Sequence, residues 1–132
     1  MKLIKLDIDG KRIDWRRIRT VLSMFNLKVI IKNSSLKRTR NGFHLYLDIK
    51  SKFFVDDLTL CFLQAVMGSD YKREMFNWNR IVYGDDWQKK HWNVLFNQKF
   101  YRKGDEIKRV SFETNMPKSI LKRRLKDYVV QR

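Results

Sequence analysis

Two aspartates close to the N-terminus have the types and spacing that metal-assisted chemistry would need. Asp7 and Asp9 stand two positions apart in a segment, residues 2–9, where apolar and polar residues alternate. Side chains at positions i and i+2 of a strand lie on one face, so both carboxylates could reach the same cation. Magnesium or manganese bound by such hard oxygen ligands could assist phosphoryl transfer. The simpler interpretation is a polar strand face that ends in a capping aspartate before Gly10.

A histidine and a tyrosine form the second candidate pair. His44 and Tyr46 alternate with apolar residues in the segment GFHLYL, residues 42–47. If the apolar side chains pack on helices, His44 and Tyr46 lie on the opposite, open side of the strand. There an imidazole could hold a phosphate and a tyrosine ring could stack on a base. The alternative is a half-exposed pair that has no ligand.

Basic residues gather in two places. The segment SSLKRTR, residues 34–40, carries Lys37, Arg38 and Arg40 with three hydroxyl groups and no acid. We expect it to be a loop that contacts phosphate, because such contacts position a strand without reading its sequence. Lys122 and Arg123 lie on the polar side of a helix expected after Pro117. A solvated basic surface without a partner is the alternative for both.

The overall charge points to a polyanion. The chain has 30 Lys and Arg against 14 Asp and Glu, a formal net charge of +16. So large an excess costs self-repulsion, which a phosphate backbone relieves. We therefore expect a nucleic-acid partner, with DNA as the first choice.

Other classes of protein fit the composition poorly. Hydrophobic residues make up 43% of the chain, which is enough for a core. The apolar runs are too short to span a bilayer and no apolar leader is visible, so we expect a cytoplasmic protein without a membrane partner. A single cysteine, Cys61, excludes an internal disulfide and a thiolate-rich zinc site.

The periodicity predicts an α+β fold. Strands are expected at 2–9, 27–32, 43–49 and 93–99, with an edge strand at 107–112. Helices are expected after Asp14, at 57–67 and at 69–79. The order β-α-β-β-α-β is that of ferredoxin-like and RNA-recognition domains, with an antiparallel sheet and helices on one face. We expect one domain, residues 1–116, and a basic amphipathic helical appendage, residues 117–132.

The first 50 residues resemble the archaeo-eukaryotic primase–polymerase superfamily. Within it they are most similar to the small primase–polymerase domains associated with bacterial DNA repair ligases. The resemblance consists of LDIDG, a helix and a strand, and then NSSLKRTRNGFHLYLDI. It implies that the two acids bind divalent metal and that the histidine contacts nucleotide phosphates. The matching residues are Asp7, Asp9, Ser34 or Ser35, Gly42 and His44.

The resemblance is incomplete, because the family also uses a third acid on a later strand. The nearest equivalent segment, REMFNWNR at residues 73–80, has Asn77 where aspartate is expected. Asp48 and Asp70 are other candidates for the third acid. We therefore expect a reduced, inactive relative of the kind carried by viruses or plasmids.

Three functions remain open at this point. The first is a nucleic-acid-binding protein without catalysis, and the second is a magnesium- or manganese-dependent nucleotidyltransferase or nuclease that uses Asp7, Asp9 and His44. The third is a protein-interaction module or homodimer formed through the apolar helix 57–67 or the C-terminal helix. The tryptophans at 78, 87 and 92 are expected to belong to the core, and a platform on which bases stack is the alternative.

Overall fold

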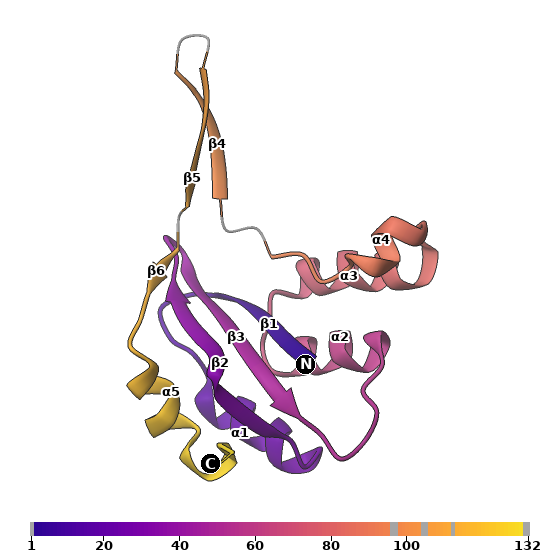
Figure 1. Cartoon of the computed structure of the whole chain (residues 1–132), viewed down its shortest axis with the longest axis vertical. Coiled ribbons are helices and arrows are strands. Elements are labelled where there is room, and N and C mark those ends of the chain that lie inside the picture. The colour runs from indigo at the N-terminus through magenta and orange to yellow at the C-terminus, as the bar shows by residue number, and fades with distance from the viewer. Residues whose placement is uncertain (1, 96–97, 104–105, 112, 131–132) are drawn as a thin grey trace.

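The fold is built on a four-stranded antiparallel sheet in the order β1-β3-β2-β6 (Figure 1). The computed structural model describes residues 2–95, 98–103, 106–111 and 113–130, with side chains described outside 98–111. The α+β class expected from the sequence is confirmed. The strands of this sheet are β1 (Lys2–Asp9), β2 (Lys28–Arg38), β3 (Gly42–Lys50) and β6 (Thr114–Asn115).

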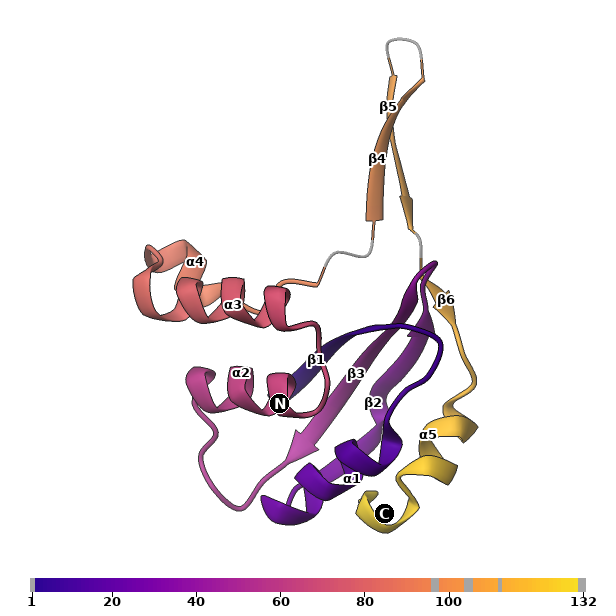
Figure 2. The same ribbon diagram turned by 180° about the vertical axis from the view of Figure 1, so that it is seen from behind.

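Two helices cover one face of the sheet, and the others flank it (Figure 2). The covering helices are α1 (Trp15–Met24) and α2 (Asp57–Val66). On the β1 side lie α3 (Tyr71–Tyr83), which packs against α2, and α4 (Asp86–Lys90). Beside β2 lie α5 (Lys118–Arg124) and the short 3₁₀ helix η1 (Lys126–Tyr128). A separate hairpin of β4 (Gln98–Lys103) and β5 (Glu106–Ser111) extends away from the sheet.

Local sequence explains where the covering helices begin and which side they bury. The carboxylate of Asp14 accepts a hydrogen bond from the backbone N–H of Arg17 at 3.0 Å, and Asp56 caps α2 in the same way. The apolar stripe of α1, namely Ile18, Val21 and Leu22, is buried against the sheet. Asn26 then takes a left-handed φ of 52° and reverses the chain into β2.

The core lies between the sheet and these helices. Alternate residues of β1 and β3 enter it, as the period of two predicts. Each fully buried aliphatic side chain contributes about 1.5–3 kcal/mol. Segment 117–132, expected to be an appendage, contributes Leu121 and Leu125, both fully buried. The backbone N–H of Val130 also donates to the carbonyl of Val29 at 2.9 Å, so the described part of this segment belongs to the same core.

The ferredoxin-like strand order is wrong. In that arrangement the last strand pairs with the first, whereas here β6 pairs with β2. Of the expected strand 93–99, residues 93–95 are not strand and 98–99 begin β4; of the expected strand 107–112, residues 107–111 belong to β5, and β4 and β5 form the separate hairpin. Residues 96, 97 and 112 lie outside the described residues. The free edge of β1 is occupied by side chains instead. The backbone N–H groups of Lys5 and Asp7 donate to Gln64 and to Ser69, each at 3.0 Å. The carbonyl of Lys5 accepts from Arg73 at 2.8 Å.

The basic loop predicted for 34–40 is mostly strand. Residues 34–38 continue β2 after a register shift between Ile30 and Ser35. The hydroxyl of Ser34 donates to the carbonyl of Ile30 at 2.8 Å and accepts from the N–H of Asp48 at 2.9 Å. Ser34 is therefore a buried support of the shift and does not face a phosphate, because both hydrogen-bonding roles of its hydroxyl are used internally.

The tryptophans divide between the core and the surface. Trp92 is 4% exposed and belongs to the core, as expected, whereas Trp78 and Trp87 are 46% and 68% exposed. The prediction that all three are buried is therefore wrong. Within the described ranges, no helix is both long and apolar enough to cross a membrane.

Candidate functional site on the open sheet face

Strand register gathers polar side chains on the sheet face opposite the core. Asp7, His44 and Lys37 are cross-strand partners in one row, and Lys5, Tyr46 and Ser35 form the next row. Oδ1 of Asp7 lies 3.5 Å from Nε2 of His44. Asp7 and His44, which the sequence singled out separately, therefore lie side by side on this face. We call Asp7, Asp9, Lys37, His44, Tyr46 and Glu113 the sheet-face cluster.

Glu113 is the member of the cluster that the sequence did not reveal. Its Oε1 lies 2.6 Å from Nδ1 of His44 and accepts a short hydrogen bond from the Tyr46 hydroxyl. Its Oε2 lies 3.4 Å from Nζ of Lys37. Glu113 directly precedes β6, so the pairing of β6 with β2 holds it over the face. No motif marks this position, because a lone glutamate between two strand segments resembles any surface residue.

His44 is much less open to solvent than we expected. It is only 4% exposed, and the side chain of Glu113 is 3% exposed. Burial lowers the pKa of His44, but hydrogen bonds to Asp7 and Glu113 and their negative charges outweigh it, so the pKa is raised. Burial raises the pKa of Glu113, but the bonds from Tyr46 and His44 and the charge of Lys37 leave it lowered. Both shifts favour the charged pair, an imidazolium facing a carboxylate, over the neutral pair.

Three aspartates lie at the outer end of the cluster. The backbone N–H of Asp70 donates to the carbonyl of Asp7 at 2.6 Å, which brings Asp70 beside the pair Asp7 and Asp9. Burial, Asp7 and Asp70 raise the pKa of Asp9, and His44 opposes them. In the described part of the chain, no three His, Cys, Asp or Glu side chains are arranged so that they could hold a metal ion. Metal binding by Asp7 and Asp9 stays a prediction.

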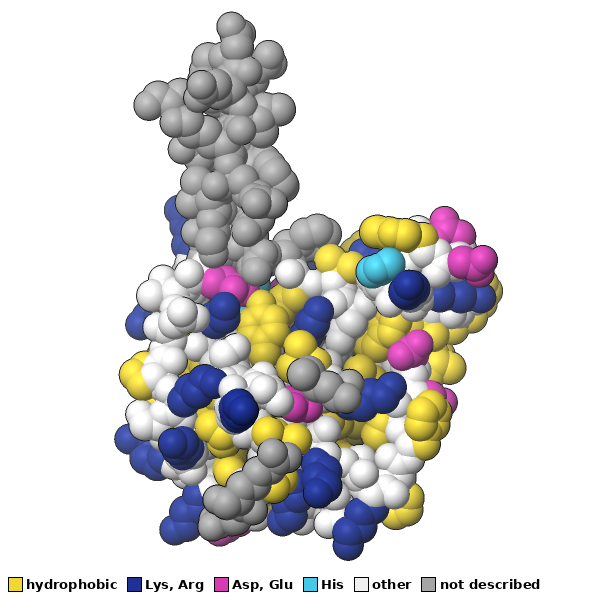
Figure 3. All heavy atoms as spheres, viewed as in Figure 1, with side chains coloured by type: hydrophobic (Ala, Val, Ile, Leu, Met, Phe, Trp, Pro, Cys, Tyr) yellow, Lys and Arg dark blue, Asp and Glu magenta, His cyan; other side chains and the backbone are white. Residues whose placement is uncertain are grey.

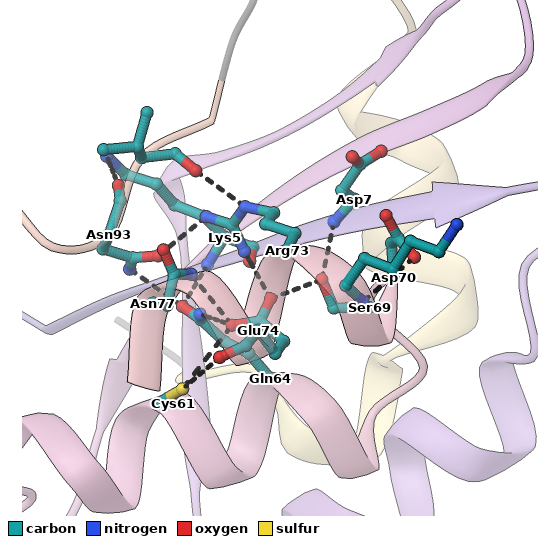
Figure 4. A network of polar contacts seen from close by, with 12 residues as sticks. Lys5, Asp7, Cys61, Gln64, Ser69, Asp70, Arg73, Glu74, Asn77 and Asn93 are labelled. Carbon is teal, nitrogen blue, oxygen red and sulfur yellow. Dashed lines mark hydrogen bonds and ion pairs between the residues drawn. The ribbon is translucent and has the colours of Figure 1, made fainter. Parts of the chain in front are cut away.

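Asn77, which stands where the resemblance to primase–polymerases predicts the family's third acid, belongs to a buried hydrogen-bond network. It lies on helix α3, whereas the family's third acid lies on a strand, and it is fully buried. Its amide donates to Glu74 at 3.0 Å and accepts from Arg80 at 2.9 Å. Glu74 also accepts from Gln64 at 2.8 Å and from Ser69 at 2.6 Å (Figure 4). This network joins α2 and α3 to the free edge of β1.

Asp48, the other candidate for a third acid, is also committed elsewhere. Its side chain is buried and accepts a hydrogen bond from Asn33 at 2.8 Å. In the strand register it pairs with Leu3, four residues before Asp7. Asp70 is therefore the acid that the structure places beside Asp7.

The predicted phosphate contacts do not gather at one point. Lys37 belongs to the sheet-face cluster, where its ammonium lies 5.7 Å from the centre of the Tyr46 ring. Arg38 and Arg40 are exposed at the turn between β2 and β3. Lys122 and Arg123 are exposed on α5 and line two separate grooves there. The cations therefore surround the sheet and do not form a single patch on its open face.

Comparisons with protein-family models, curated proteins and solved structures found no match for the chain. The resemblance to primase–polymerases therefore stays a prediction. The geometry by itself shows the buried imidazole of His44 between the carboxylates of Asp7 and Glu113. The exposed Asp9 lies on the same face. Such a group can exchange a proton or orient a neighbouring ligand.

Proposed function

We propose that this protein binds nucleic acid, DNA in the first place, by neutralising its phosphate backbone. The observation that carries the proposal is that few of the lysines and arginines are paired with a carboxylate. Among the lysines and arginines that the structure describes, only Lys37 and Arg73 form a salt bridge with a carboxylate. The remaining positive charge repels itself until an anion binds.

The arrangement of these cations suits a long polyanion better than a small anion. They lie on α1, at the turn between β2 and β3, and on α5, and Figure 3 shows Lys and Arg gathered over α5 and the adjacent part of the sheet. Contacts spread over several phosphates release counterions and give affinity without base recognition. The juxtaposition of Asp7 with His44 supports a primase-like ancestry, and a degenerate replication protein of a virus or plasmid is the role that we infer.

The test is direct binding to labelled oligonucleotides. Fluorescence anisotropy would be measured with single-stranded DNA, single-stranded RNA and duplex DNA at low salt, in the presence of EDTA. We expect a dissociation constant of about 1 µM or below for at least one of them at about 50 mM salt. Absence of binding to all three would overturn the proposal.

A divalent-metal-dependent nucleotidyltransferase or nuclease is the second candidate function. The negative charges of Asp7 and Asp70, which raise the pKa of Asp9, favour it, since a cation would relieve their repulsion. The three described carboxylates are not arranged as a ready metal site, so a bound ion would have to draw them together. Its test is incubation of DNA and nucleotides with manganese or magnesium. Extension or cleavage that is lost in Asp9→Ala would establish this candidate in place of simple binding.

A contact with a second copy of the chain is a third candidate. Helix 57–67 and the C-terminal helix, where we expected this contact, pack into the core, although Phe62 remains 51% exposed. The exposed apolar stripe lies instead on α3, at Tyr71, Met75, Trp78 and Val82. A dimer mass in solution that returns to the monomer mass in Met75→Lys would support it.

A further inference from the structure

A groove between α1 and α5 has the charge and lining of a site for single-stranded nucleic acid. It encloses about 600 Å³, and its lining residues Leu36 and Phe43 lie on the sheet face opposite to that of Lys37 and His44. Figure 2 shows the two helices side by side, and Nη1 of Arg19 donates to the carbonyl of Arg124 at 3.1 Å. We call this the α1–α5 groove. Its cationic residues are Lys11, Arg12, Arg16, Arg19, Arg123 and Arg124.

The positive charge of the groove is uncompensated. Among the residues that the structure describes, none of the six cations forms a salt bridge with a carboxylate. The one acid that lines the groove, Asp14, caps α1 through its bond with the N–H of Arg17. The cations stand on both walls, four in or just before α1 and two on α5. A phosphate chain lying between the walls would therefore meet cations on either side.

The lining between the cations is apolar and partly aromatic. Trp15 and Phe43 are half-buried and contribute to it, together with Met116 and Ile120. A duplex presents phosphates outwards and keeps its bases stacked inside, so it makes little use of such a surface. A single strand can place its phosphates on the cations and stack its bases on the rings. The combination favours a single strand over a duplex or an acidic peptide.

We propose that the α1–α5 groove holds the backbone of single-stranded nucleic acid, with bases against Trp15 and Phe43. This inference rests on the proposed function and specifies where and in which form the ligand binds. It uses neither Asp7, Asp9 nor His44. The groove and the sheet-face cluster are therefore separable by mutation.

The test compares two charge reversals of equal size. Arg16→Glu with Arg123→Glu reverses one cation on each wall of the groove. Lys89→Glu with Lys90→Glu makes the same change in net charge on the exposed helix α4. Affinity for single-stranded oligothymidylate would be measured by anisotropy after circular dichroism confirms folding. We expect the groove variant to lose about tenfold or more and the α4 variant about threefold or less.

Each outcome has a defined meaning. Equal losses in the two variants would overturn the groove and leave the proposed function intact. Binding of duplex DNA alone by the unaltered protein would likewise overturn only the groove, whereas no binding of single-stranded DNA, single-stranded RNA or duplex DNA would overturn both. Duplex DNA or polyglutamate bound as tightly as oligothymidylate, with the same loss in the groove variant, would overturn the single-strand assignment. Photocrosslinking of bromouracil-substituted oligonucleotide, followed by mass spectrometry, should label the peptide that contains Trp15 or Phe43. Labelling confined to other peptides would contradict base stacking in the groove.

Discussion

Oε1 of Glu113 lies 2.6 Å from Nδ1 of His44, although 69 positions separate the two residues in the sequence. The contact fixes the imidazole ring from one side while Asp7 lies 3.5 Å from its other nitrogen. Glu113 also accepts from Tyr46 and pairs with Lys37, so it contacts three other members of the sheet-face cluster. The cluster is therefore a built polar site, even though nucleic acid is expected to gain most of its affinity elsewhere.

Replacing Glu113 should lower the pKa of His44. In Glu113→Gln the neighbouring negative charge is lost, so the imidazolium is stabilised less. The chain has two histidines, and His91→Asn assigns the proton NMR signals of the imidazole rings. We expect His44 to titrate above its ordinary 6.5 in the unaltered protein and lower in the variant. An unchanged pKa in Glu113→Gln would contradict the assigned contact.

The stability of the protein should fall as pH rises above 6.5. The pKa of His44 is raised in the folded state, so its contribution is fully present below the unfolded value and is lost as pH rises through the folded value. Urea unfolding at a series of pH values would measure this change. His44→Gln should remove most of the decline in this window. A free energy of unfolding that is flat or rises through the window would contradict a raised pKa.

The sequence predicted local elements well and long-range pairing poorly. The alternation of Asp7, Asp9, His44 and Tyr46 on one face follows from a period of two, so it was accessible from residue types alone. The two-residue strand β6, which follows Glu113, could not be predicted, because two residues are too few to show a periodic pattern. The hydrogen bonds that Gln64 and other side chains make to the edge of β1 could not be predicted either, since they depend on how the helices pack. The ferredoxin order failed for that reason.

Asn77→Asp should destabilise the protein and should not create an active site. A new carboxylate at this buried position would face Glu74, whose oxygen lies 3.0 Å from the Asn77 amide nitrogen. We expect a loss of about 3 kcal/mol in the free energy of unfolding at neutral pH, partly recovered in acid. Asn79→Asp, on the exposed side of the same helix, is the matched control and should cost about 0.5 kcal/mol or less. Equal effects of the two substitutions would contradict the buried network.

Asp9→Asn should leave nucleic-acid binding intact or strengthen it slightly. Asp9 is exposed beside Asp7 and Asp70, where its negative charge repels phosphate. Removing that charge should raise the affinity for single-stranded DNA in EDTA by about twofold or less. Anisotropy measures the change, with Asp86→Asn on α4 as the control. A large loss of affinity in EDTA would contradict this expectation, whereas a loss seen only when manganese replaces EDTA is what the metal-dependent alternative requires.

The dependence of affinity on salt tests the central claim most directly. The observed binding constant for oligothymidylate would be measured by anisotropy from about 50 to about 200 mM salt and plotted on logarithmic axes. If uncompensated cations hold the phosphate backbone, the slope should be about −2.8 or steeper, which corresponds to about four neutralised phosphates on a single strand. A slope close to zero would show that the positive charge takes no part in binding and would contradict the account.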